Sequence, residues 1–501
     1  MKKILLILCL MLVAFGAQAQ TWQYTTSMND VRWLAGMVSL NNQTALMVGG
    51  FHAGGGPGLA SCEIYDPVTA TWSYTGSLHV GRAYPTLVKL GNGHILSMCG
   101  GLYMGDGAAT PVVEDYDPAT GVWTVIGSLN TARFVPTATV LANGKVLLAG
   151  GLVDGSTSST SEVFDPTTGT SVTTGVMNER RYEHQAVLMG DGKVMVNGGR
   201  DGGSGSYYSN DVEIFDPATG TWTVAPSMVQ ARMEAITTRF SDNTILAAAG
   251  RNTPGTSAPG SEVFDPSTMT WNNTAAVMEP VCWAGSIPFP DDRFMITGGM
   301  IDANWGDAYG LDNLTTPKCE WYDHTFQAWY FAPELNLSRC RHNAVYIHQT
   351  TSTEIPEEFL LVAGGQTGTV DASGAHFSPA SFTNTAEILD VTPSALKAYM
   401  KLPTNAHASV NTVAGIDNNF KVYYQTDGSM GVAYTTTTDD NVTIEVMSVD
   451  GRMAKRIMNN VLVASGVHTA TIQTNDLAAG AYFIHYATTH SNHVFKFNVM
   501  K

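Results

Sequence analysis

A pair of small residues recurs at a nearly constant spacing along most of this 501-residue chain. In order, the pairs are Gly49-Gly50, Gly100-Gly101, Gly150-Gly151, Gly198-Gly199, Ala249-Gly250, Gly298-Gly299 and Gly364-Gly365. The first members of successive pairs are 51, 50, 48, 51, 49 and 66 residues apart. A period near fifty residues predicts a repeat architecture, and seven copies predict seven structural units.

Each unit has the pattern of several short strands. An apolar segment ends at the small residues, and a second segment ends in an aromatic residue and Asp, as at Tyr65-Asp66 and Phe164-Asp165. No segment with helical periodicity interrupts the units. A small sheet cannot bury both its faces alone, and stacking the sheets in a ring also protects their edges. The sequence therefore predicts an all-β fold, a seven-bladed β-propeller.

The order of these motifs resembles the kelch family. A kelch blade has Arg at its first strand, Gly-Gly after the second, Tyr-Asp-Pro after the third and Trp in the fourth. The Trp positions here are Trp72, Trp123, Trp222, Trp271 and Trp329, and Ser171 stands at this position in the third unit. The resemblance covers roughly residues 21–400. Residues 21–28 look like a fourth strand without the other three, so we expect them to complete the last blade and close the ring.

Two charged residues repeat at equivalent places in the units. Glu lies three residues before the turn Asp at Glu63, Glu114, Glu162, Glu213, Glu262, Glu320 and Glu387. Arg opens the first strand at Arg32, Arg82, Arg133, Arg181, Arg232 and Arg341, whereas Val281 stands at this place in the sixth unit. One ligand rarely needs seven copies of one group, so we expect structural Arg–Glu pairs and another partner for Glu320.

The N-terminus and the composition indicate an exported protein. Met1-Lys2-Lys3 precedes a short apolar run and Ala17-Gln18-Ala19, the pattern of a cleavable signal peptide over residues 1–19. No later apolar run is long enough to span a membrane. The net charge of −17 argues against nucleic acid and anionic membranes as partners.

The cysteines do not predict a metal or redox site. Five remain after removal of the signal peptide, so at least one is unpaired, and none forms a C-x-x-C motif. We expect them to be buried in strands, with one bridge among the last three as an alternative. No cofactor is predicted.

The C-terminal part of the chain has a different β pattern. The segment 442–449 alternates apolar and polar residues before the turn at Asp450-Gly451, and the chain ends Lys496-Phe-Asn-Val-Met-Lys501. These features resemble the C-terminal sorting domain of type IX secretion cargo, roughly over residues 410–501. The resemblance implies contact with that secretion machinery and a place outside a Gram-negative cell or on its surface. We therefore expect a propeller over residues 20–403, then a linker and a small β-sandwich over 404–501.

The loops on one face of the propeller carry the candidate ligand-binding residues. The starts of the first strands and the residues beside them supply Trp33, Tyr84, Phe134, Tyr182, Glu183, Glu234, Trp283 and His342. Longer loops on the same face supply Tyr103, Tyr207, Tyr208, Trp305, Tyr309, His376 and Phe377. Aromatic residues interleaved with carboxylates suit sugar stacking or protein contact, although about half of the aromatics would pack the rim. We predict a secreted binding protein for a glycan or a protein partner.

An enzyme using the same channel is the alternative hypothesis. Galactose-oxidase-like copper enzymes are kelch propellers that use a Tyr crosslinked to Cys, a Tyr followed by His, and another His. Tyr84 matches the position of the crosslinked Tyr, but Ala35 stands where the Cys is expected, and no Tyr-His dipeptide occurs. Copper needs several converging ligands, so the sequence predicts no catalytic residue and no metal ligand.

Overall fold

A computed structural model shows two all-β units. It describes residues 21–52, 56–103, 108–201, 207–253, 256–301, 315–324, 327–349, 357–367, 381–391, 420–424, 430–436, 439–448, 453–474, 477, 480–488 and 492–499. Contacts divide the chain between Thr392 and Pro393. The predicted signal peptide and the expected boundary after residue 403 lie outside the described residues, as do Trp305, Tyr309, His376 and Phe377.

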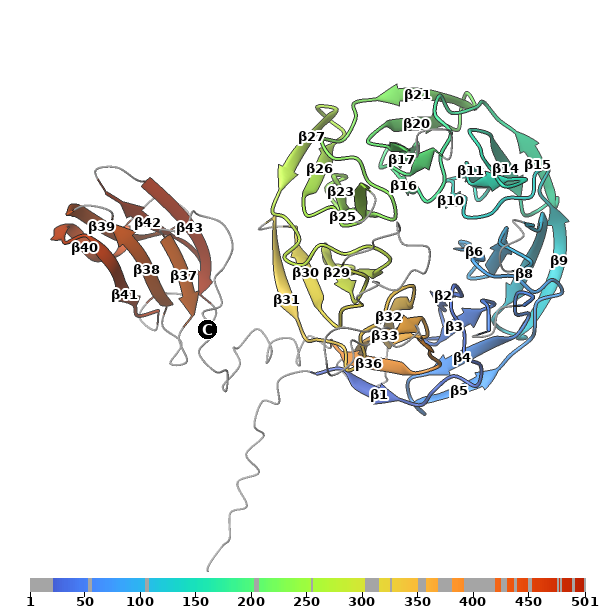
Figure 1. Ribbon diagram of the computed structural model, residues 1–501, viewed down its shortest axis with the longest axis horizontal. Helices are drawn as coiled ribbons and strands as arrows, with labels where there is room; N and C mark the ends of the chain where they lie inside the picture. The colour runs from blue at the N-terminus through green and yellow to red at the C-terminus, as the bar shows by residue number, and fades with distance from the viewer. Residues whose placement is uncertain are drawn as a thin grey trace, which may run out of the picture. The chain divides into compact units, whose positions relative to one another are not determined.

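In the part of the first unit that the structure describes, seven four-stranded antiparallel sheets form a ring (Figure 1). From the inner strand outward, the first three blades are β2 (Gly36–Ser39), β3 (Ala45–Val48), β4 (Cys62–Asp66) and β5 (Thr71–Tyr74); β6 (Thr86–Lys89), β7 (Ile95–Met98), β8 (Val112–Asp117) and β9 (Val122–Ser128); and β10 (Thr137–Val140), β11 (Val146–Ala149), β14 (Ser161–Asp165) and β15 (Thr170–Thr173). The next three are β16 (Gln185–Leu188), β17 (Val194–Asn197), β20 (Val212–Asp216) and β21 (Thr221–Ala225); β22 (Ile236–Arg239), β23 (Ile245–Ala248), β26 (Ser261–Asp265) and β27 (Thr270–Thr274); and β28 (Gly285–Pro288), β29 (Arg293–Thr297), β30 (Cys319–Asp323) and β31 (Ala328–Ala332). The last blade is β32 (Asn343–Gln349), β33 (Glu357–Ala363), β36 (Ala386–Asp390) and β1 (Gln23–Thr25). The predicted seven-bladed propeller is confirmed.

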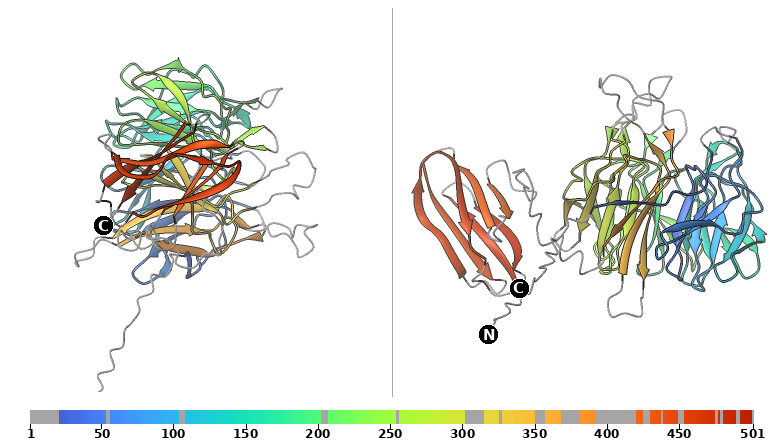
Figure 2. Two further views of the ribbon diagram at one scale, coloured as in Figure 1. Left: turned by 90° about the vertical axis from the view of Figure 1, so that its left-hand side faces the viewer. Right: turned by 90° about the horizontal axis from the view of Figure 1, so that it is seen from below.

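Short hairpins extend four of the loops between second and third strands. They are β12 (Leu152–Val153) with β13 (Ser156–Thr157), β18 (Arg200–Asp201) with β19 (Tyr207–Tyr208), β24 (Arg251–Thr253) with β25 (Thr256–Ser257), and β34 (Gln366–Thr367) with β35 (Ser381–Phe382). Figure 2 shows the ring from its side, with the blade strands running between its two faces.

The N-terminal strand closes the ring, as the sequence predicts. β1 pairs with β36, with Gln23 opposite Ile388 and Thr25 opposite Ala386. Trp22, directly before β1, is buried and donates its indole N–H to the carbonyl oxygen of Pro333 at 2.9 Å. The last blade therefore joins both ends of the propeller in one sheet, which leaves no blade without its fourth strand.

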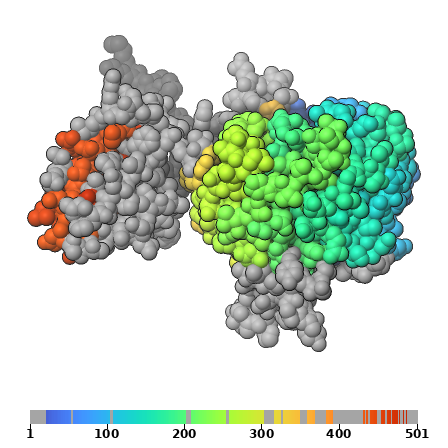
Figure 3. All heavy atoms as spheres, turned by 90° about the horizontal axis from the view of Figure 1, so that it is seen from above, coloured from blue at the N-terminus to red at the C-terminus, as the bar shows by residue number. Residues whose placement is uncertain are grey.

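The blades are held together by apolar second strands and by repeated aromatic pairs. All four residues of β3, β7, β11, β17 and β23 are buried. Each kelch Trp lies opposite the aromatic residue before the turn Asp, as Trp72 does with Tyr65, at a centroid distance of 5.1 Å. In the third blade Phe164 faces Ser171 instead. Figure 3 shows the side wall of the propeller, where the atoms of successive blades, coloured from yellow-green to blue-green, lie against one another.

The repeated Arg and Glu residues form buried ion pairs inside blades. The N···O distances range from 2.7 to 3.1 Å in the pairs Arg32–Glu63, Arg82–Glu114, Arg133–Glu162, Arg181–Glu213, Arg232–Glu262 and Arg339–Glu387. Arg341 is not the repeat arginine of the last blade. The repeat arginine is Arg339, which lies three residues after Asn336, just as Arg32 lies three residues after Asn29. The backbone N–H of each of these Asn residues binds the repeat glutamate of its blade.

Glu320 lacks an arginine partner among the described residues, because Val281 stands in place of the arginine. Its carboxyl group accepts hydrogen bonds from the backbone N–H groups of Met278 and Glu279 instead. Burial raises the pKa of Glu320 to about 7, because these two hydrogen bonds only partly offset the loss of water. The five cysteines are buried and unpaired.

The second unit is a small β-sandwich. One sheet contains β37 (Phe420–Tyr424), β38 (Met430–Thr436) and β41 (Gly466–Ile472). The other contains β40 (Met453–Val463), β39 (Asp440–Ser448), β42 (Gly480–Ala487) and β43 (Asn492–Val499). Alternate residues of both sheets share one apolar core, as the alternation in 442–449 predicts. Across the described residues, no helix is long and apolar enough to cross a membrane.

Candidate functional site

Seven residues at the starts of the inner strands form a ring around the propeller axis. They share a left-handed backbone, with φ between 47° and 54°, and are Leu34, Tyr84, Val135, Glu183, Glu234, Trp283 and Arg341. Backbone hydrogen bonds link members of this inner ring, for example from Glu234 N to Glu183 O and from Arg341 N to Trp283 O. Non-glycine residues rarely adopt this conformation, and its repetition in all seven blades makes it a feature of the propeller repeat.

The residue before each ring member is held by the loop behind it. Isolated bridges join Trp33 to Phe51, Phe134 to Leu152, and Tyr182 to Arg200. Each of these bridges holds the residue after a Gly-Gly pair against the residue before a ring member.

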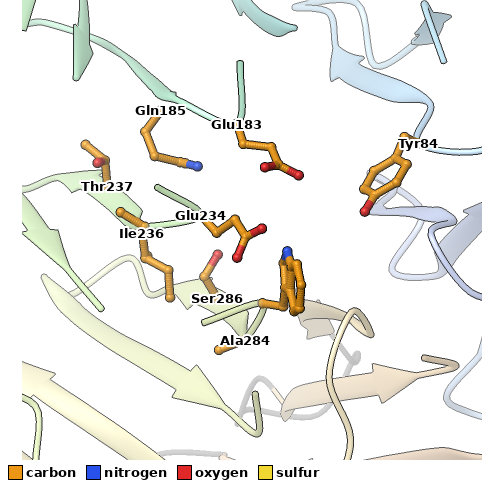
Figure 4. A pocket seen from close by; sticks show the side chains of 10 residues that line it. Tyr84, Glu183, Gln185, Glu234, Ile236, Thr237, Ala284 and Ser286 are labelled. Atoms are coloured by element: carbon orange, nitrogen blue, oxygen red, sulfur yellow. The ribbon is translucent and has the colours of Figure 1, made fainter. Parts of the chain in front are cut away.

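A cavity of about 270 Å³, lined by polar and apolar side chains in similar measure, opens beside this ring. Its lining residues are Tyr84, Glu183, Gln185, Glu234, Ala235, Ile236, Thr237, Trp283, Ala284 and Ser286. Figure 4 shows the carboxyl groups of Glu183 and Glu234 directed into one space, with the hydroxyl of Tyr84 on its other side. We call this cavity the central pocket.

The two glutamates of the central pocket are a coupled pair. Burial raises the pKa of Glu183, against the attraction of Arg341 and Arg251. Burial also raises the pKa of Glu234 well above its usual range, and the negative charge of Glu183 raises it further. Two carboxyl groups placed this way cannot both ionise readily.

Two arginines lie against the Trp283 ring. The guanidinium carbon of Arg341 is 3.6 Å from the ring centroid, and that of Arg251 is 3.9 Å from it. Two guanidinium groups this close to one centroid would overlap on a single face, so they cover opposite faces of the indole. A sugar ring therefore cannot stack on Trp283 without displacing an arginine.

Arg251 also reaches the acid pair. Its Nε lies 3.1 Å from Oε2 of Glu234, and both side chains are almost fully buried. The carboxyl group of Glu234 also has that of Glu183 as a hydrogen-bonding neighbour. The central pocket thus contains a buried carboxyl pair that is held from one side by an arginine.

The sequence-predicted site residues fall into two groups. The central pocket brings together Tyr84, Glu183, Glu234 and Trp283. The other four pack behind it: Trp33 stacks on Phe382 at 4.7 Å, Phe134 meets Tyr84 edge-on, Tyr182 bridges to Arg200, and His342 is buried. The imidazole Nε2 of His342 lies 2.9 Å from the hydroxyl of Thr297, and burial lowers the pKa of His342 to about 3.

Sequence reasoning missed several residues of the site. Gln185, Thr237 and Ser286 lie in inner strands and line the central pocket. The repeat pattern predicts Arg341 as a repeat arginine rather than a site residue. Arg251, the second residue after Ala249, belongs to no repeated motif that would mark it as a site residue. Aligning each repeat on its Arg–Glu pair would have placed Arg341 in the inner ring.

The central pocket does not fit the copper site of galactose-oxidase-like enzymes. Beside Tyr84 the donors are carboxyl groups, and the pocket lining contains no histidine. The two buried histidines next to the inner ring, His184 and His342, place Nε2 against the hydroxyls of Thr137 and Thr297. No cluster of three or more His, Cys, Asp or Glu suited to a metal exists within the described residues.

Comparisons with known proteins agree with this architecture. Residues 181–229 match the family model of the Kelch motif. Residues 427–500 match the model of the secretion system C-terminal sorting domain. This is a secreted kelch-repeat protein. Its sorting domain indicates type IX secretion and a location outside the cell or on its surface.

Structural similarity supports the fold alone. One similar solved structure is described as a "Novel fungal alcohol oxidase with catalytic diversity among the AA5 family, in complex with copper". It aligns with a TM-score of 0.56 and 13% identity, over 96% of this chain and 100% of that chain. The comparison with curated proteins found no match.

Proposed function

We propose that this secreted kelch-repeat protein binds a glycan, and that the central pocket holds one sugar unit of it. The observation that carries the proposal is the cavity at the inner ring, into which the carboxyl groups of Glu183 and Glu234 are directed. Its volume of about 270 Å³ is slightly below the roughly 300–1,000 Å³ typical of ligand pockets, so it suits one small group.

The chemistry of the lining favours a ligand rich in hydroxyl groups. Carboxyl, amide and hydroxyl side chains of Glu183, Gln185 and Ser286 face the same space. Such groups can both donate and accept hydrogen bonds, as sugar hydroxyls do. A protein partner would need a broader apolar contact than this lining offers.

Binding to a panel of immobilised glycans tests the proposal, using the full secreted chain. Gln185→Ala removes an amide from the central pocket, and Gln23→Ala removes a matched amide from the exposed strand β1. We expect the first variant to lose binding and the second to keep it. Equal binding by both would contradict the proposal, and binding only to proteins would favour the alternative partner class.

The acid pair favours a second candidate, a carbohydrate-active enzyme. Coupled carboxyl groups with raised pKa values are typical of general acid–base sites. Incubating the protein with a bound oligosaccharide and analysing the products by mass spectrometry tests this role. An unchanged oligosaccharide would leave binding as the function of the central pocket.

A further inference from the structure

The charged groups around the central pocket are unevenly matched. Arg251 and Arg341 lie against Trp283, beside the carboxyl groups of Glu183 and Glu234. Only one of these two guanidinium groups has a carboxylate at ion-pair distance among the described residues. A partly buried charge without such a partner is unfavourable unless a ligand or a counter-ion neutralises it.

The group without such a carboxylate is the guanidinium of Arg341. Arg251 has Glu234 at ion-pair distance, whereas Arg341 has no carboxylate within that distance among the described residues. The Nε of Arg341 is buried and has no hydrogen-bond partner in the same part of the chain. Arg341 is therefore the cation that a ligand would neutralise.

Trp283 holds this arginine ready for such a ligand. The Arg341 guanidinium lies against the indole at 3.6 Å, a contact that uses its flat face. Its N–H groups point outward in the plane of the guanidinium and remain able to bind an anion. Arg341 is also fixed at its backbone, because its N–H binds the carbonyl of Trp283 at 2.9 Å.

We propose that the ligand is an acidic sugar, and that Arg341, positioned by Trp283, binds its anionic group. The proposal rests on the proposed glycan binding at the same pocket. A carboxylate or a sulfate would form paired hydrogen bonds with the guanidinium fork. The hydroxyl groups of the same sugar would then reach Glu183 and Gln185.

Affinity measurements with matched oligosaccharides test this inference. Uronic-acid, sulfated and neutral oligosaccharides of equal length are titrated into the full secreted chain. Arg341→Met removes the charge but keeps an unbranched stem against Trp283. The control is Arg180→Met, because the side chain of Arg180 is 54% exposed and is paired with Asp201 at 3.2 Å.

We expect wild-type protein to prefer one of the acidic oligosaccharides, and Arg341→Met to lose at least about tenfold in affinity for it. Arg180→Met should lose less than about twofold. Affinity for the acidic ligand should fall as salt rises, since screening weakens the ion pair. Comparing the affinities for the uronic-acid and the sulfated oligosaccharides shows whether the bound anionic group is a carboxylate or a sulfate.

Other outcomes would overturn the inference. A preference for neutral oligosaccharides, with Arg341→Met unchanged, would refute it and leave glycan binding intact. Absence of binding to every oligosaccharide would refute the glycan proposal itself, and binding to an acidic peptide alone would assign the site to a protein partner. If Arg341→Met does not fold, the affinity of Arg341→Lys for the acidic oligosaccharide, measured across salt concentrations, tests the role of Arg341 instead. Unchanged affinity in Arg341→Lys at all salt concentrations would contradict a guanidinium fork.

Discussion

Glu320 should make the stability of the propeller depend on pH. Its pKa in the folded protein is about 7, against an ordinary value of 4.5. A raised pKa in the folded state means that this group stabilises the fold below pH 4.5, and that the contribution is lost as pH rises through about 7. The difference of about 2.5 in pKa corresponds to at most about 3 kcal/mol.

Glu320→Gln removes this titration while keeping an oxygen that can accept from Met278 and Glu279. The variant should gain stability relative to wild type between pH 5 and pH 8, by about 1–3 kcal/mol. Glu213→Gln is the matched control in the fourth blade. There the substitution leaves the buried Arg181 without its carboxylate, and we expect a loss of about 3–5 kcal/mol at pH 7.

Thermal unfolding of the full secreted chain, measured by calorimetry across this pH range, compares the three proteins. The reasoning requires the wild-type and Glu320→Gln curves to converge at low pH and to separate as pH rises. Parallel curves would refute it, because Glu320 would then titrate alike in the folded and unfolded states.

Three further predictions concern closure, sorting and the central pocket. Deleting residues 21–28 should lower the melting temperature, because it removes the β1 ladder and the buried Trp22, and an unchanged melting curve would contradict ring closure. Removing residues 410–501 should leave a folded propeller trapped in the periplasm; cell fractionation checks this, and normal export would disprove the sorting role. Trp283→Ala should weaken ligand binding by roughly 1–3 kcal/mol by releasing Arg251 and Arg341, whereas Trp72→Ala should lower only the melting temperature. Equal binding loss at equal stability loss would show that Trp283 is only part of the core.

The fold could be predicted from the sequence because its signals repeat. Each Gly-Gly pair, each turn Asp and each kelch Trp occurs in several copies, so an exception such as Ser171 does not hide the period. The fourth strand of the last blade could also be predicted, because residues 21–28 have the pattern of a fourth strand but are not preceded by the other three strands of a blade.

The candidate site could be predicted only in part. Tyr84, Glu183, Glu234 and Trp283 could be found because they follow the repeat. The signal that separates Arg339 from Arg341 is the spacing of Arg339 from Asn336, which equals that of Arg32 from Asn29. The hydrogen bond to Glu387 identifies Arg339 as the buried member. The stacking of Arg251 and Arg341 on Trp283 depends on contacts between blades, which no local pattern encodes.

A crystal structure of the full secreted chain with its best-binding oligosaccharide tests the central claim most directly. The account predicts a sugar unit in the central pocket, with hydroxyl groups within hydrogen-bond distance of Glu183 or Gln185. Density for the sugar on the outer wall or on the opposite face, with the central pocket unchanged, would contradict it.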